Sequence, residues 1–264
     1  MTAVRDPDAA RPSMTAEDTE PATAPVGAEE SGTEDGPTAF RFQVQPEFHP
    51  VPLGIGEDED TLHERLRRFS HDYWGEREDL EPLHRLTTAA YSANAEGLTA
   101  GGTVYSALGV FPIGGTSDGS EPPERVSRAT LTVSVRDLPN PDPHMTAAGI
   151  SEALDKASGG GEVQPITLPA GPAVVHVAGA RAVWELPEGD QERFFVRIEV
   201  WLPFPDEDRL LLFCLSTADV QDLYHYQAVL ADIADTIAFG EDDAPAPADA
   251  EPSPALAVSP FGSY

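Results

Sequence analysis

The sequence is poor in cysteine and in lysine, and both shortages restrict what the chain can be. Cys214 is the only cysteine, so no disulfide can form within the chain, and its place in the apolar run LLLFCL predicts a buried small side chain rather than a nucleophile. Lys156 is the only lysine beside 15 arginines, and the net charge is −30. Because nucleic acids and anionic membranes are bound through clustered basic side chains, this charge argues against both as partners.

Long apolar stretches are also absent. The first 14 residues lack the apolar core of a secretory signal peptide, and no window of 18 residues is both apolar and uncharged. From these two absences we expect a soluble protein of the cytoplasm that does not enter a membrane.

Large apolar side chains are scarce at both ends of the chain. Residues 1–39 carry nine acids and two arginines, and residues 240–264, rich in Pro and Ala, carry five acids and no base. Neither segment can bury enough apolar surface to offset an ordering entropy of about 1–2 kcal/mol per residue. We therefore expect disordered acidic tails at 1–39 and 240–264, around a single α+β domain at 40–239.

Spacings of three and four between apolar residues predict four helices in this domain. The first follows the acids at 57–60 and ends near Gly75, and the second runs from about Pro82 to Gly97. The third begins after Asp142 and continues to about Ala157. The last follows a cap at Ser216 or Thr217. The expected buried positions are Leu83, Leu86, Ala90 and Tyr91 in the second helix, and Leu223, Tyr226, Leu230, Ile233 and Ile237 in the last.

Alternation of apolar and polar residues predicts the strands, at 40–45, 101–113, 125–135, 163–168, 173–177, 192–202 and 210–215. Residues 180–186 either continue the strand at 173–177 or pair with it. Strands joined by short loops pair antiparallel, and residues 210–215 are apolar at every position, which is typical of a central strand covered on both sides. The expected fold is a three-layer α/β/α sandwich with a mainly antiparallel sheet.

Three segments also carry a family resemblance: ITLPAGPAVVHV at 166–177, FFVRIEVWLPFPDEDRLLLFCLST at 194–217, and YHYQAVLADIADTIAF at 224–239. Their wording and layout resemble actinobacterial proteins similar to the PsbP/Mog-like α/β/α sandwich, a group that includes LpqN-type lipoproteins. The resemblance implies a binding or accessory module without catalytic activity. The exported location of the lipoproteins does not carry over, because the chain has neither a signal peptide nor a lipobox cysteine.

The sequence contains no recognisable catalytic, cofactor or metal motif, so we predict no site of these kinds. Gly54 and Gly56 precede a helix, but a third glycine is missing and the acids that follow would repel a pyrophosphate. His63 and His71 lie about 12 Å apart on one helix, too far to share a metal, and the other histidines are scattered. Ser216 and Thr217 lie between a strand and a helix, but they lack the glycines of a nucleophile elbow.

Aromatic side chains give the remaining functional indication. Trp74, Trp201 and Tyr224 are expected outside the main buried stripes of their elements, where aromatic residues often anchor a partner. The leading hypothesis is a non-catalytic interaction or accessory protein whose partner is another protein. The alternatives are a cytosolic secretion-associated chaperone or adaptor, and an enzyme that acts on a small molecule through a site without a known motif.

Overall fold

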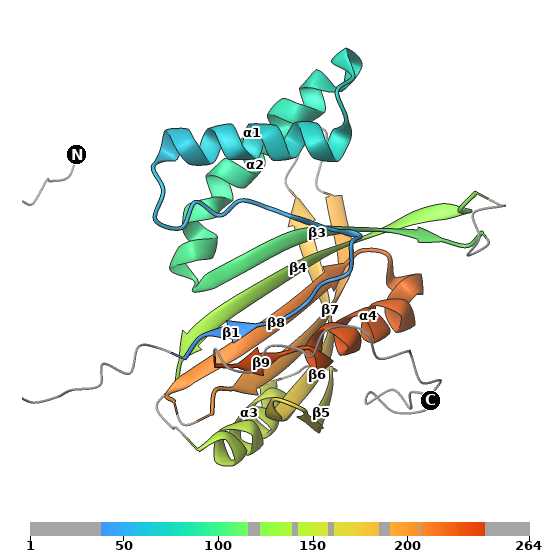
Figure 1. The fold of residues 1–264 in the computed structure, drawn as a ribbon. Coiled ribbons are helices and arrows are strands. Elements are labelled where there is room, and N and C mark those ends of the chain that lie inside the picture. Colours follow the sequence, from blue (N-terminus) through green and yellow to red (C-terminus); the bar gives the residue numbers. More distant parts are fainter. Residues whose placement is uncertain are drawn as a thin grey trace, which may run out of the picture. The chain divides into compact units, whose positions relative to one another are not determined.

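The structure, a computed structural model, describes residues 38–115, 122–138, 142–157, 161–184, 191–205 and 207–240 (Figure 1). All of them belong to one of the two units into which the chain divides, Thr38–Tyr264. The acidic tails expected at 1–39 and 240–264 lie outside the described residues, apart from Thr38, Ala39 and Gly240.

Helices and strands of the described ranges form an α+β fold, as the sequence predicts. The helices are α1 (Glu59–Trp74), α2 (Glu81–Ala100), α3 (Pro143–Ala157) and α4 (Leu223–Asp235), with short 3₁₀ turns η1 (Glu78–Leu80) and η2 (Val220–Asp222). The strands are β1 (Phe40–Arg41), β2 (Phe48–Pro50), β3 (Thr103–Ile113), β4 (Arg125–Asp137), β5 (Glu162–Leu168), β6 (Gly171–Trp184), β7 (Gln191–Pro203), β8 (Arg209–Thr217) and β9 (Ala238–Phe239). No helix in these ranges has both the length and the apolar character that a membrane crossing requires.

Seven strands form one sheet in the order β2-β3-β4-β8-β7-β6-β5, and each neighbouring pair is antiparallel. The expected antiparallel sheet is therefore confirmed, with β8 inside it as the apolar run at 210–215 indicated. Residues 180–184 continue the preceding strand, because β6 runs unbroken to Trp184, and positions 185 and 186 lie outside the described residues. Gly171 has a φ of 139°, a conformation that favours glycine at the tight β5–β6 turn.

Acidic residues in the sequence correctly predict where two of the helices begin. The Asp58 carboxylate accepts a hydrogen bond of 2.8 Å from the Thr61 backbone N–H at the start of α1. Asp142 accepts backbone hydrogen bonds from His144 and Met145 at the start of α3. Both acids are the N-terminal residues that the sequence indicates.

The predicted cap of the last helix is wrong. Ser216 and Thr217 belong to β8, and α4 begins only at Leu223, after the turn η2. Thr217 Oγ1 donates to the Arg128 carbonyl and accepts from the Asp219 backbone N–H, so this hydroxyl ties β8 to β4 and to the following turn. The two residues predicted to cap the helix therefore end a strand instead.

The predicted buried face of the second helix is wrong for Leu83, Leu86 and Ala90, although Tyr91 does pack against the cluster around Leu66. His84, Thr88 and Ala95 are the buried residues of α2, whereas Leu86 is 65% exposed and Leu83 is 36% exposed. Packing between α1 and α2 selects this face. The Ser70 hydroxyl of α1 donates 3.0 Å to the His84 carbonyl, which holds the polar side of α2 inward.

The strand expected at 40–45 is shorter than predicted and lies outside the main sheet. β1 covers only Phe40 and Arg41 and pairs with β9 at the other end of the domain. The Gly240 N–H donates to the Ala39 carbonyl and so joins the two ends, and the Thr38 N–H donates to Glu207, just before β8. The folded domain therefore extends slightly beyond the predicted limits of 40 and 239.

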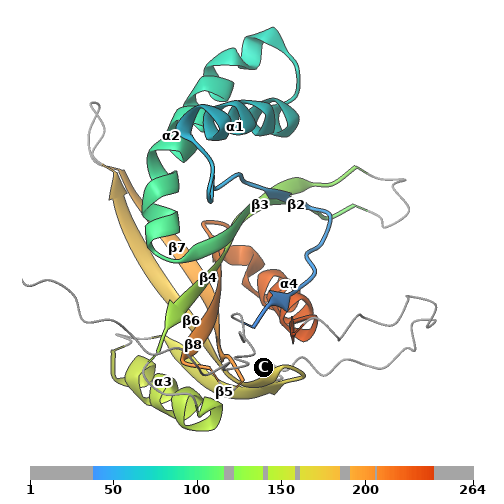
Figure 2. The ribbon, with the colours of Figure 1, turned by 60° about the vertical axis from the view of Figure 1, so that its left-hand side comes forward.

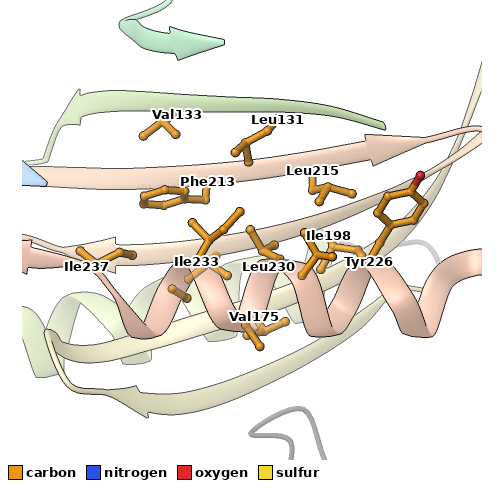
Figure 3. Packing of buried hydrophobic residues seen from close by; sticks show 14 of the residues in the cluster. Leu131, Val133, Val175, Ile198, Phe213, Leu215, Tyr226, Leu230, Ile233 and Ile237 are labelled. Atoms are coloured by element: carbon orange, nitrogen blue, oxygen red, sulfur yellow. The ribbon is translucent and has the colours of Figure 1, made fainter. Parts of the chain in front are cut away.

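The main core lies between α4 and one face of the sheet (Figure 3). The buried face of α4 includes Tyr226, Leu230 and Ile233, as the helical spacing predicts, and Ile237 is buried just after the helix ends. Opposite them, alternate strand residues point at the helix: Leu131, Val133, Phe213, Leu215, Ile198 and Val175.

The other face of the sheet is covered in two separate places. Near β2 and β3, Leu108 packs with Leu66 and Phe69 of α1, while its neighbour Ala107 belongs to the α4 side. At the other edge, α3 packs on β5, β6 and β7. Figures 1 and 2 both show α3 and the α1–α2 pair at opposite ends of the sheet. The strands between them carry the candidate site.

Candidate functional site

An open cleft of about 870 Å³ lies on this second face of the sheet, beside α3. We call it the β6–β7 cleft and define it by its lining residues: Arg136, Leu154, Ala157, Gly161, His176, Ala178, Gly179, Phe194, Arg197, Glu199, Trp201 and Leu212. Its volume is within the range of ~300–1,000 Å³ that is usual for small-molecule sites. The cleft is therefore large enough for a ligand of moderate size.

Sheet register brings the polar residues of the cleft together. His176 of β6 is the direct cross-strand partner of Glu199 of β7, which is in turn opposite Cys214 of β8. Side chains alternate between the two faces of a strand, so Glu199 shares its face with Arg197 and Trp201. Their neighbours Ile198 and Val200 point the other way, into the α4 core.

Glu199 is a buried carboxylate whose two oxygens have different partners. Oε2 lies 2.8 Å from His176 Nδ1 and accepts a hydrogen bond of 3.3 Å from Trp201 Nε1. Oε1 faces Arg197, with 3.6 Å between it and Nη1. His176 and Glu199 are each only 6% exposed. A buried charge needs such partners, and this arrangement fixes the indole of Trp201 at the cleft wall.

Two guanidinium groups give the cleft a positive lining in a strongly acidic protein. Arg136, at the end of β4, is exposed and makes no ion pair with residues that the structure describes. The side chain of Arg197 is 46% exposed, and its Nη1 lies 3.6 Å from Oε1 of Glu199. Guanidinium groups bind carboxylates and phosphates well because their N–H groups match the geometry of two acceptor oxygens.

The remaining wall of the cleft is apolar. Leu154 and Ala157 come from α3, and Phe194, which is 47% exposed, comes from the start of β7. Gly161 is required where it lies, because a Cβ there would be 2.7 Å from His176 Nε2. The cleft thus combines an apolar wall with the polar His176–Glu199 pair and two arginines.

Cys214 is opposite Glu199 in the strand register and is half-buried, rather than buried as predicted. Burial, and secondly the charge of Glu199, raise the pKa of the thiol to about 11. Because the thiolate is the reactive form, this pKa favours the expected role of a small apolar side chain over that of a nucleophile.

The structure separates the three aromatic residues selected from the sequence. Trp201 lines the cleft, whereas Trp74 ends α1 and donates 2.8 Å to the Thr87 hydroxyl. Tyr224 is 70% exposed on α4, over the opposite face of the sheet. Only Trp201 belongs to the cleft, and a partner-binding role for Trp74 and Tyr224 stays a prediction.

Sequence reasoning missed His176, Glu199, Arg136 and Arg197 as members of one site. The signal available was the second face of the strand at 192–202, where Phe195, Arg197, Glu199 and Trp201 replace the aliphatic residues expected of a covered strand. A polar face on a strand inside the sheet indicates a surface that no helix covers.

Comparison with known proteins adds little about function. No family model matches the chain, and no curated protein matches it. Among solved structures it is similar to "LpqN involved in cell envelope biogenesis of Mycobacterium tuberculosis", with 9% identity, a TM-score of 0.37, and coverage of 80% of this chain and 88% of that one. The PsbP/Mog-like grouping and the actinobacterial origin implied by the sequence resemblance stay predictions.

Proposed function

We propose that this chain is a non-catalytic accessory protein that binds a small amphipathic acid in the β6–β7 cleft. The observation that carries the proposal is that two arginines, Arg136 and Arg197, line one cleft together with an apolar wall. An anionic head group would bind Arg197, and an apolar body would lie against Trp201 and Leu154.

The potentially reactive side chains in and below the cleft already have contacts within the protein, which favours binding over catalysis. The Glu199 carboxylate is already engaged by His176, Trp201 and Arg197. His176 turns Nδ1 toward Glu199, and its Nε2 is buried beside Gly161. With Cys214 protonated, the cleft offers recognition rather than bond making.

The proposal includes the architecture and setting expected from the sequence. We propose a three-layer α/β/α arrangement, with α4 on one side of the sheet and α1, α2 and α3 on the other. The uncovered part of the second side then provides the ligand cleft. A cytoplasmic location, without a nucleic-acid or membrane partner, accords with the net charge of −30.

A protein partner is the alternative occupant that the sequence favoured. The solvent-exposed Leu86 and Tyr224 support a partner surface, but they lie on separate helices, away from the cleft. We therefore place a small acid first and an adaptor role second. An enzyme acting on the same ligand is the remaining alternative.

Calorimetric titration of the full chain with sodium laurate tests the proposal. We expect saturable binding of one laurate, and at least tenfold weaker binding in Arg197→Gln and in Trp201→Ala. Arg193→Gln is the matched control, because Arg193 is exposed on the same strand but does not line the cleft. Dodecyltrimethylammonium, with the same chain and the opposite charge, should bind far more weakly.

Equal affinity for laurate and dodecyltrimethylammonium would contradict an acid-binding cleft. So would an equal loss of laurate affinity in Arg193→Gln and Arg197→Gln. Mass spectrometry of the recovered ligand separates binding from turnover. An unaltered ligand supports the accessory role, and a modified one would establish the enzyme.

A further inference from the structure

A second group of titratable side chains lies away from the cleft, where α1 ends and α2 begins. His71 is in the last turn of α1, Glu81 is the first residue of α2, and His84 follows one turn later. Glycine at position 75, with a φ of 87°, ends α1 and starts the short connection that brings the two helix ends together.

The three side chains converge on one point. The rings of His71 and His84 have centroids 4.1 Å apart, and one nitrogen of each ring and one Glu81 oxygen all lie within 4.8 Å of one another. Glu81 Oε2 is 3.6 Å from His84 Nδ1, longer than a hydrogen bond. They are close without being bonded to one another.

His84 is buried with its hydrogen-bonding capacity unused. It is 3% exposed, and neither ring nitrogen has a hydrogen-bond partner among the described residues. His71 Nδ1 is likewise buried without a partner there. Buried polar atoms are almost always satisfied, and each one left unpaired is destabilising. Three such nitrogens side by side, two of His84 and one of His71, therefore favour a ligand between the rings.

The surrounding contacts hold the cluster in place. Ser70 Oγ donates to the His84 carbonyl, which fixes α1 against α2 beside the two rings. Arg85 Nε donates 2.8 Å to Glu81 Oε1 and orients the carboxylate. The other oxygen of Glu81 faces His84 and is available to a cation.

We propose that His71, Glu81 and His84 form a binding site for a divalent cation of the zinc class. Two imidazole nitrogens and one carboxylate oxygen are a donor set that suits zinc and its neighbours in the first transition row. Calcium and magnesium prefer oxygen donors alone, and so they fit this set poorly.

The geometry requires only small movements to hold the ion. Bonds of ~2.0–2.1 Å in a tetrahedral site place donor atoms about 3.3 Å apart. The donor atoms now lie within 4.8 Å of one another and would reach this distance by side-chain rotation, while the ring centroids, 4.1 Å apart, would move outward. Glu76, whose Oε2 is 3.8 Å from His71 Nδ1, or a water molecule would supply the fourth donor. The ion would then clip the end of α1 to the start of α2.

Zinc titration of the untagged full chain against a colorimetric chelator tests the site. We expect one equivalent of tight binding, which weakens at least tenfold in His71→Gln and in Glu81→Gln. His63→Gln is the matched control, because His63 is exposed on the same helix, two turns away, and should bind zinc like the unaltered chain. Replacement of zinc by cobalt should give the strong visible absorption of a tetrahedral centre.

Thermal melting provides a second readout that does not depend on the chelator. A cation that binds only the folded state raises its melting temperature, and we expect this rise in the unaltered chain and in His63→Gln but not in His71→Gln. Circular dichroism checks that each variant is folded. Absence of saturable binding, or the same affinity in His63→Gln and His71→Gln, would overturn the proposal. Arg197→Gln should leave zinc binding unchanged, which separates this site from the cleft.

Discussion

At the scale of single residues, buried polar contacts fix how α4 meets the sheet. The hydroxyl groups of Tyr226 and Ser127 lie 2.7 Å apart, and both residues are fully buried. Such a pair stabilises the folded state modestly, but the loss of one member leaves the other without its partner in the core.

Tyr226→Phe is therefore expected to lower the free energy of unfolding by about 1–2 kcal/mol. Tyr224→Phe makes the same chemical change two residues away on a side chain that is 70% exposed, and it should change stability by less than about 0.5 kcal/mol. Urea denaturation of the two variants gives the comparison. Equal effects would show that the buried hydroxyl contact is not stabilising.

The ion pair between Arg125 and Asp222 predicts a pH dependence. Hydrogen bonds from Arg125 hold the pKa of the Asp222 carboxyl below its ordinary value. In the unfolded chain that value is about 3.9. The pair therefore stabilises the fold fully above this pH, and its contribution is lost as the pH falls through the lower pKa of the folded state.

We expect Asp222→Asn to be less stable than the unaltered chain at pH 7 and the difference to shrink below about pH 4. Urea midpoints at pH 7, 5, 4 and 3 measure it. A difference that stays constant over this range would mean that the carboxylate charge makes no contribution.

At the scale of elements, local signals in the sequence located most helices and strands, but packing decided their faces. Asp58 and Asp142 begin helices and Gly75 ends one, each through contacts with residues close to it in the sequence, so these helix ends could be predicted. The pairing of His176 with Glu199 depends on strand register, and the meeting of His71 with His84 depends on how two helices pack. Neither contact has a signature in the neighbouring sequence, which is why both candidate sites were missed.

The α1–α2 pair allows a direct test of which helix face is buried. Leu66 of α1 is fully buried, so Leu66→Ala should lower the free energy of unfolding by about 2–5 kcal/mol. Leu86 of α2, at a position that periodicity assigned to the core, is 65% exposed, and Leu86→Ala should change it by less than about 0.5 kcal/mol. Urea denaturation distinguishes them. A large fall in the free energy of unfolding in Leu86→Ala would mean that the helix face predicted from the sequence is the buried one.

At the scale of the whole molecule, the two ends of the folded domain are joined to each other. Phe40 pairs with Phe239 across β1 and β9, and the Phe40 ring packs edge-on against Phe204. The hydrogen bonds of Thr38 and Gly240 lie just outside this pair. The first and last residues that the folded domain needs for its stability are therefore set by these contacts rather than by composition alone.

Removal of residues 1–37 and 241–264 should change the melting temperature by less than about 2 °C, since those segments have few large apolar side chains. Removal of residues 1–41 and 238–264 also deletes β1 and β9, and it should lower the melting temperature by at least about 5 °C. Differential scanning calorimetry measures both. A large fall with the shorter deletion would show that a terminal segment packs on the domain.

The position of β4 beside β8 also affects how the chain folds as it is made. Hairpins within β5–β8 join strands that follow one another, but β4 must wait for β8, which is synthesised after α3 and three further strands. At ~5–20 residues per second, that interval is roughly 4–16 seconds on the ribosome. Until β8 is made, the edge of β4 that faces away from β3 has no partner strand. Unpaired strand edges are prone to aggregate. The nascent chain is therefore most vulnerable between the completion of β4 and the arrival of β8.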